Sequence, residues 1–182
     1  HDDGSDPTHR HHHDNAHDDE YGISSFVYRA RRPFHAERLG DFVQSDLFDP
    51  ILRSKGTIWL ATRFEDTILW SQAGDELMFD LIGTWWADTP RDAWPEDADE
   101  RAFIDGEWVE PWGDRRQELV FIGLHMEQGP IRAALDAALL TDEEMALGRE
   151  KWAEMDDPFP EWEDDMLLDD LIIAPGLGGD DA

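Results

Sequence analysis

The chain has 182 residues, of which 44 are acidic and 15 basic, so its formal net charge at pH 7 is −29. This charge repels nucleic acid and anionic membrane surfaces, and we expect neither as a partner. The sequence contains no cysteine, which excludes a disulfide framework, and no apolar run long enough to span a bilayer; both features favour a cytoplasmic protein.

The first segment, residues 1–20, is rich in histidine and aspartate and lacks apolar periodicity, so we expect a disordered linker arm. It holds six of the chain's eight histidines. Neutral imidazoles and carboxylates suit Zn²⁺, Co²⁺ and Ni²⁺, and a tract without fixed structure binds such ions loosely. The candidate metal ligands are His9, His11, His12, His13 and His17. A solvated interdomain linker is the alternative, and an expression tag fits the interrupted histidines less well.

Residues 21–162 have the pattern of one folded domain, and the acidic residues 163–182 form an expected tail. Segment 23–32 is rich in β-branched and aromatic side chains, which is typical of a strand. Pro33 then opens a predicted helix. Its apolar residues recur at helical spacing: Leu39, Phe42, Val43 and Leu47.

Three short β-rich runs follow this helix, at residues 56–62, 67–72 and 77–82. The links between them are only a few residues long. Links of this length imply antiparallel pairing between successive strands.

The segment 85–114 interrupts the strand pattern with proline, tryptophan and acidic residues, and we interpret it as a long excursion from the sheet edge. Its large aromatics either roof the core or form a surface for a partner, and we favour the roof. They are Trp85, Trp86, Trp94, Trp108 and Trp112.

The last predicted strand is 117–124, and Gly129-Pro130 introduces a second helix that has one apolar face. Thr141 and Glu144 have the spacing of a capping box and predict a further short helix. The predicted fold is therefore an α+β two-layer sandwich. It has an antiparallel sheet of about four strands with two helices on one face, a Trp-rich insertion and a short C-terminal helix.

Two pairs of side chains, one basic and one of histidines, each have two possible roles. Arg53 and Lys55, beside Gly56, form either a small anion site at a glycine turn or the solvated start of a strand with acidic neighbours, and we favour the second. His35 and His125 are either structural hydrogen-bonding residues or ligands, and we leave both out of the metal set.

Three arginines near the first predicted strand also stand out in so acidic a chain: Arg29, Arg31 and Arg32. They either pair with nearby carboxylates or dock a domain that lies outside this chain. We favour pairing within the domain.

Six strings spread over about residues 20 to 162 resemble, in this order, the C-terminal domain of the CobW-type GTPases, a metal-chaperone family related to cobalamin biosynthesis proteins. The strings are EYGISSFVYRARRPFHAERL, ILRSKGTIWLATR, ILWSQAG, GDRRQELVFIGL, RAALDAALLTDEEM and DPFPEW. The resemblance implies that an N-terminal P-loop GTPase domain is joined to this domain, often through a histidine-rich tract. It also implies that GTP hydrolysis is coupled to delivery of Zn²⁺ or Co²⁺ to a metal-requiring client protein.

A P-loop needs the pattern G-x-x-x-x-G-K-[ST], because its glycine amides cradle the phosphates that its lysine reaches. The chain has two lysines, Lys55 and Lys151, and neither lies in such a pattern. The family's cysteine-containing metal motif, which belongs to its GTPase half, is also missing, as is a nucleophile signature such as G-x-S-x-G. We therefore expect no catalysis by this chain alone. GTP and Mg²⁺ would bind to a GTPase domain outside it, and the start at histidine is consistent with a fragment of a longer protein.

The favoured function is an accessory and interaction domain of a GTP-dependent metal chaperone, with the arm binding divalent metal. The alternative is a purely structural interaction module whose arm only links domains. The extreme acidity is also typical of proteins adapted to concentrated salt, which screens mutual repulsion.

Overall fold

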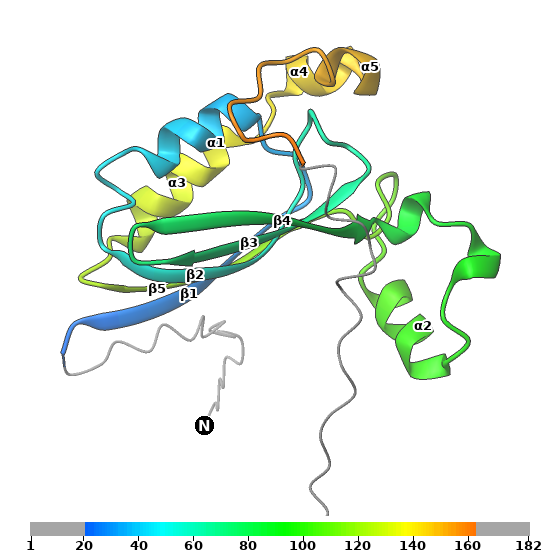
Figure 1. Cartoon of the computed structure of the whole chain (residues 1–182), viewed down its shortest axis with the longest axis horizontal. Coiled ribbons are helices and arrows are strands. Elements are labelled where there is room, and N and C mark those ends of the chain that lie inside the picture. The colour runs from blue at the N-terminus through cyan, green and yellow to red at the C-terminus, as the bar shows by residue number, and fades with distance from the viewer. Residues whose placement is uncertain (1–20, 163–182) are drawn as a thin grey trace, which may run out of the picture.

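The computed structural model describes residues 21–162. Its centre is one antiparallel sheet of five strands in the order β1-β5-β2-β3-β4 (Figure 1). The strands are β1 (Ile23–Ala30), β2 (Ile51–Ile58), β3 (Asp66–Ala73), β4 (Glu76–Thr84) and β5 (Gln117–Leu124). The arm with its five candidate ligands, and the acidic tail, lie outside the described residues.

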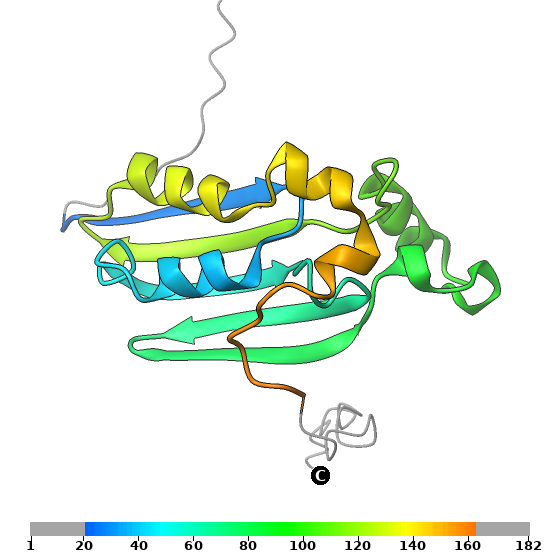
Figure 2. The same cartoon turned by 90° about the horizontal axis from the view of Figure 1, so that it is seen from above.

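Two helices, α1 (Ala36–Val43) and α3 (Gln128–Ala138), lie side by side on one face of the sheet (Figures 1 and 2). Each turns an apolar stripe with helical period toward the strands, as a half-buried helix requires. The buried members of these stripes are Ala36, Leu39, Phe42, Ile131, Leu135 and Ala138. This arrangement confirms the α+β sandwich with two helices on one face.

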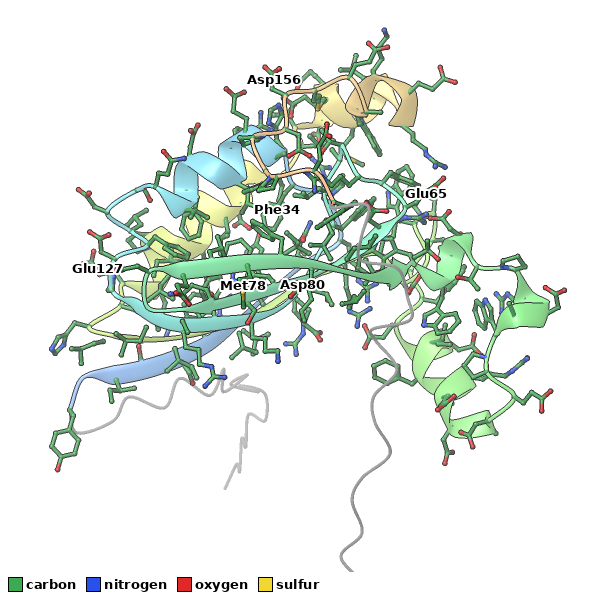
Figure 3. All side chains as sticks on the ribbon, viewed as in Figure 1. Phe34, Glu65, Met78, Asp80, Glu127 and Asp156 are labelled. Atoms are coloured by element: carbon green, nitrogen blue, oxygen red, sulfur yellow. The ribbon has the colours of Figure 1, made fainter. Side chains whose placement is uncertain are left out.

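Phe34 lies at the centre of the core, between the sheet and the helical layer (Figure 3). It pairs through its backbone with both Leu60 and Leu139, and its ring lies 6.2 Å from that of Tyr28. Tyr28 in turn donates a hydrogen bond to Asp136 on α3 (2.8 Å). Burial and this hydrogen bond both raise the pKa of the Tyr28 hydroxyl. The phenol is therefore a neutral donor that joins β1 to α3.

The chain closes with α4 (Asp142–Leu147), α5 (Arg149–Trp152) and a C-terminal strap, residues 153–162. The predicted capping box is confirmed: the Thr141 hydroxyl accepts from the Glu144 amide, and the Glu144 carboxylate accepts from the Thr141 amide. The strap covers the part of the sheet that the helices leave free. Its Phe159 ring packs 4.5 Å from that of Phe79 on β4.

Two details of the predicted sheet are wrong. The sheet has five strands, where about four were predicted. The run predicted at 56–62 is β2 at Ile51–Ile58, because the chain leaves the sheet at Trp59. There Trp59 accepts a hydrogen bond from the Phe34 amide (2.9 Å). The Gln117 side chain bonds both backbone groups of Trp59 (2.9 and 2.8 Å), which replaces the missing ladder partners.

None of the helices within residues 21–162 is long and apolar enough to cross a bilayer.

Candidate functional site

The sheet face opposite α1 and α3, here called the open face, carries half-exposed aliphatic side chains. On β5, Leu119 and Phe121 are buried under the helices, while the residues that alternate with them are 38–41% exposed. Antiparallel sheets with one wet face normally place polar residues there. Instead, the open face presents Ile23, Met78, Ile82, Val120, Ile122 and Leu124. Figure 3 labels Met78 beside Asp80 on β4, the edge strand.

The ratio of acidic to basic residues is lower on the open face than in the chain as a whole. Arg53 and Lys55 project from β2 on this side, and neither makes an ion pair with any other residue of the described range. The glycine turn expected beside them is absent, because Gly56 lies within β2, opposite Leu119 of β5. A Cβ at this glycine would lie 1.9 Å from the Glu118 carbonyl oxygen. The predicted glycine turn is therefore wrong. Arg53 and Lys55 are exposed, as the solvated alternative predicts, although neither pairs with a carboxylate within residues 21–162.

A Trp-rich insertion, residues 85–116, leaves the end of β4 and returns at β5. It contains two short 3-10 helices and α2 (Ala98–Gly106), which begins at the side-chain cap of Asp97. Asp114 fixes its base by accepting hydrogen bonds from the amides of Trp86 and Ala87 (3.1 and 2.9 Å). Figure 1 shows α2 beyond one end of the sheet, on the side opposite α1 and α3.

Four of the five tryptophans of the segment divide into two groups, and the fifth, Trp85, is buried directly after β4. Trp86, Trp94 and Trp108 pack in a row, with ring centroids 6.0 and 5.7 Å apart, and the Arg91 guanidinium lies over two of them. They form a small core of the insertion itself. Trp112 instead lies between the rings of Trp59 and Trp152 (5.9 and 5.6 Å) and packs against a second, smaller cluster of buried residues: Ala61, Leu140 and Trp152.

A pocket of about 250 Å³, here called the corner pocket, lies where the insertion meets the open face. Its lining includes Thr57, Thr67, Ile82, Trp85, Phe103 and Arg116. Trp85 is only 2% exposed, and its indole N–H has no hydrogen-bond partner within residues 21–162. A buried donor without a partner costs about 1–3 kcal/mol. The Trp85 N–H is therefore an unsatisfied donor covered by protein atoms beside the corner pocket, whose lining includes the charged residues Glu107, Asp114 and Arg116.

An ion-pair network borders the corner pocket, and its residues line a second hollow of about 360 Å³. Arg116 lies 3.2 Å from Glu107 and 3.9 Å from Glu118. Arg29 pairs with Glu118 (3.0 Å) and Arg31 with Glu107 (3.3 Å). Arg32, the third of these arginines, pairs instead with Asp142 at the start of α4 (2.8 Å). Pairing within the domain is thus confirmed for all three arginines.

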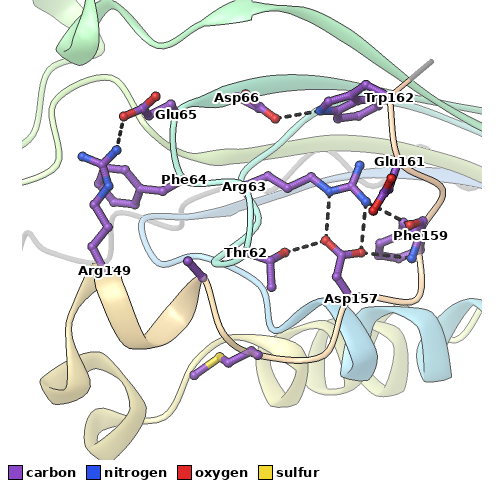
Figure 4. Close-up of a pocket in the computed structure, with 12 residues that line it drawn as sticks. Thr62, Arg63, Phe64, Glu65, Asp66, Arg149, Asp157, Phe159, Glu161 and Trp162 are labelled. Atoms are coloured by element: carbon purple, nitrogen blue, oxygen red, sulfur yellow. Dashed lines mark hydrogen bonds and ion pairs between the residues drawn. The ribbon is translucent and has the colours of Figure 1, made fainter. Parts of the chain in front are cut away.

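The pocket in Figure 4, of about 540 Å³, lies between the β2–β3 loop and the C-terminal strap. Asp157 of the strap accepts hydrogen bonds from the Thr62 hydroxyl (2.6 Å) and from Arg63 (2.8 and 3.2 Å). The Arg63 guanidinium also lies 4.6 Å from the Trp162 ring centre. These side chains satisfy one another's hydrogen-bonding groups. We therefore interpret the Thr62–Arg63–Asp157 interactions, here called the clasp, as the contacts that hold the strap on the domain.

The histidines of the domain do not gather into a site. His35 precedes α1 and its amide donates to the Ala138 carbonyl (2.8 Å). His125 adopts a positive φ of 54° after β5, with its ring against Gly22. Within residues 21–162, no group of three or more His, Asp or Glu side chains could hold a metal ion. The five predicted metal ligands lie outside this range.

The sequence contains a signal for the open face in the strand at 117–124. QELVFIGL is apolar at both alternating sets of positions, and a strand of this kind is typical of a sheet covered on both faces. The corner pocket left no such signal, because Thr57, Trp85 and Arg116 are far apart in sequence.

Comparison with known proteins assigns this fold. Residues 23–139 match the family model described as the cobalamin synthesis protein cobW C-terminal domain. The chain belongs to the CobW C-terminal domain family. The resemblance seen in the sequence is thereby confirmed, and the match covers the whole sheet together with α1, α2 and α3.

Two curated relatives of this CobW C-terminal domain have names that refer to zinc. Zinc-regulated GTPase metalloprotein activator 1 of Dictyostelium discoideum is 44% identical over 142 residues, which are 76% of this chain and 30% of that protein. A zinc chaperone of Mycobacterium tuberculosis is 38% identical over 145 residues, which are 79% of this chain and 36% of that protein. The chain thus spans about a third of the length of these relatives.

Among solved structures, the zinc-bound YjiA GTPase from E. coli is similar, with a TM-score of 0.46 and 20% sequence identity. The match covers 65% of this chain and 30% of the YjiA chain.

Proposed function

We propose that this domain is the C-terminal accessory and interaction domain of a GTP-dependent zinc chaperone. The observation that carries the proposal is the 44% identity with a protein named as a zinc-regulated GTPase metalloprotein activator. In this proposal GTP and Mg²⁺ bind to a P-loop domain outside this chain. The domain described here contacts that GTPase domain and a metal-requiring client protein in the cytoplasm.

The cargo metal would be collected by the arm, through His9, His11, His12, His13 and His17. Imidazole nitrogens bind Zn²⁺ well, and Co²⁺ and Ni²⁺ are accepted by the same donors. The names of the relatives favour zinc over cobalt and nickel. Since a histidine must be neutral to bind metal, affinity should fall as the pH drops through the range near 6.5.

Competition with a chromophoric chelator tests this metal site. Zn²⁺ and Co²⁺ are titrated at pH 7.5 and high salt into residues 1–182, into residues 21–182, and into a variant whose five arm histidines are alanine. Of these three proteins, we expect only residues 1–182 to take up metal, with loose and exchangeable binding. A matched control replaces His35 and His125 by alanine and should bind like the parent. Equal weak binding by all four proteins, or equal retention at pH 5 and pH 7.5, would rule out imidazole ligation by the arm.

A purely structural role is the second candidate, and the half-exposed aliphatic open face favours it. In this case the arm only links domains and the sheet docks a protein. The two functions differ in metal uptake by the arm, so the same titration separates them.

A further inference from the structure

We infer that the open face and the corner pocket form one docking surface, and that its occupant is the GTPase domain that precedes this domain in the same polypeptide. The inference rests on the proposed function, because it takes a GTPase domain as the neighbour. It adds the surface that this neighbour covers, and the pocket that anchors it.

The first argument is the apolar character of the open face. Val120, Ile122 and Leu124 form a continuous aliphatic row on β5, and Ile82 extends the surface toward α2. Helices and strap cover only the opposite side of the sheet. A sheet whose outward residues are aliphatic gains stability when a second layer covers it, by about 25 cal/mol per Å² of apolar surface removed from water.

The second argument is charge. The chain has 44 acidic residues against 15 basic ones, yet on the open face the three cations Arg29, Arg53 and Lys55 are balanced by three carboxylates: Glu76, Asp80 and Glu118. Like charges brought together at an interface cost several kcal/mol. A neighbouring domain that carries a net negative charge would therefore meet less repulsion at the open face than at the acidic remainder of the surface.

The third argument is the corner pocket. The buried Trp85 lines a hollow that also contains Phe103 and Ile82. Interfaces are anchored by desolvated pockets of this kind. We assign to this pocket an apolar side chain of the GTPase domain.

The fourth argument is the position of the domain in its relatives. The family match begins at residue 23, and Ile23 is the first residue of β1 and belongs to the open face. The family is a C-terminal domain, and the matched segments are 30% and 36% of the two relatives, so most of each relative precedes the match. A preceding domain thus joins this one at the edge of the open face.

Thiol footprinting tests the inference, because the chain has no cysteine of its own. Single cysteines are introduced as Val120→Cys on the open face, Phe103→Cys at the corner pocket and Leu147→Cys on α4 as the matched control. Phe103 is 65% exposed and Leu147 57% exposed, so both thiols start from similar accessibility. Maleimide labelling of each peptide is followed by mass spectrometry, in residues 1–182 and in the full-length protein with its GTPase domain.

We expect Val120→Cys and Phe103→Cys to label at least roughly tenfold more slowly in the full-length protein than in residues 1–182, and Leu147→Cys to label equally in both. Equal rates for all three cysteines would overturn the inference. Slow labelling of Val120→Cys in residues 1–182 themselves, accelerated by dilution, would assign the open face to a second copy and would also overturn it.

Zinc uptake and GTP hydrolysis are measured on the same full-length samples. If both are present while Val120→Cys labels equally in the two proteins, the docking inference fails and the proposed function stands. If neither is present, the proposed function fails, and slow labelling would then belong to a neighbour that is not a GTPase.

Discussion

Arg38 on α1 and Glu144 on α4 form a two-pronged ion pair, with nitrogen–oxygen distances of 2.8 and 2.6 Å. The same carboxylate accepts from the Thr141 amide (2.8 Å). One side chain therefore closes the capping box of α4 and joins this helix to the helical layer. The hydrogen bond from Arg38 is the main reason that the pKa of Glu144 falls from 4.5 to about 2.

Loss of this ion pair should produce pH-dependent destabilisation. Because the folded-state pKa of Glu144 lies below its ordinary value, its contribution is complete above about pH 4.5 and is lost as the pH falls toward 2. We expect Glu144→Gln to lower the free energy of unfolding by about 1–3 kcal/mol at pH 7. The difference from the parent should narrow below pH 4.5, as measured by denaturant unfolding at several pH values. Glu143→Gln, an exposed neighbour on α4, is the control and should have little effect at any pH.

The clasp of Figure 4 should hold the C-terminal strap in place. Asp157→Asn removes the charge that pairs with Arg63, whose side chain is largely buried. We expect a loss of about 1–3 kcal/mol and faster proteolytic cleavage within residues 153–162. Asp156→Asn, at the exposed neighbouring position, should leave cleavage unchanged. If both variants were cleaved at the parent's rate, the strap would be held by packing alone.

Close approach of two strands requires a glycine at position 56. Gly56→Ala should lower the free energy of unfolding by about 3 kcal/mol or more, because its Cβ would meet the Glu118 carbonyl and force β2 away from β5. Gly106→Ala, at the end of α2, has nothing within 4 Å of the added Cβ and should be neutral or slightly stabilising. Thermal and denaturant unfolding of the two variants would contradict this explanation if their losses were similar.

Salt should stabilise the domain. A net charge of −29 makes the compact state repel itself, and added ions screen that repulsion. We expect the free energy of unfolding to rise steeply between dilute buffer and about 1 M KCl, where the screening length has fallen to about 3 Å, and then to level off. Equal stability in dilute buffer and molar KCl would remove the basis for adaptation to concentrated salt.

Elements with strong local signals were predictable from the sequence. The strand 117–124 was placed at its observed bounds, and the Thr141–Glu144 spacing gave the start of α4. The bounds predicted for β2 were wrong because its outward-facing residues include Arg53 and Lys55. These charged side chains obscure the strand-like pattern of buried residues to which Ile51 and Ser54 belong. The short α2 was missed because its helical signal is weak among acidic residues and depends on the cap at Asp97.

The candidate site was predictable only in part. The aliphatic row of β5 is visible in the sequence, but its outward orientation becomes clear only when the sheet order places the helices on the other face. The corner pocket depends on the return of the insertion to β5, which brings Trp85 and Arg116 together with Thr57. Contacts between segments that are far apart in the sequence leave no periodic pattern from which they could be predicted.

The acidity of the chain also bears on how an aliphatic sheet face can stay uncovered in solution. Isolated domains with such a face tend to stick to copies of themselves. Two copies of this domain carry the same large negative charge, so each approach of one toward the other is opposed over the whole encounter. Colloidal repulsion of this kind would keep the aliphatic face of each molecule free for the GTPase domain that we propose as its neighbour, because a linker imposes a local concentration that separate copies do not reach.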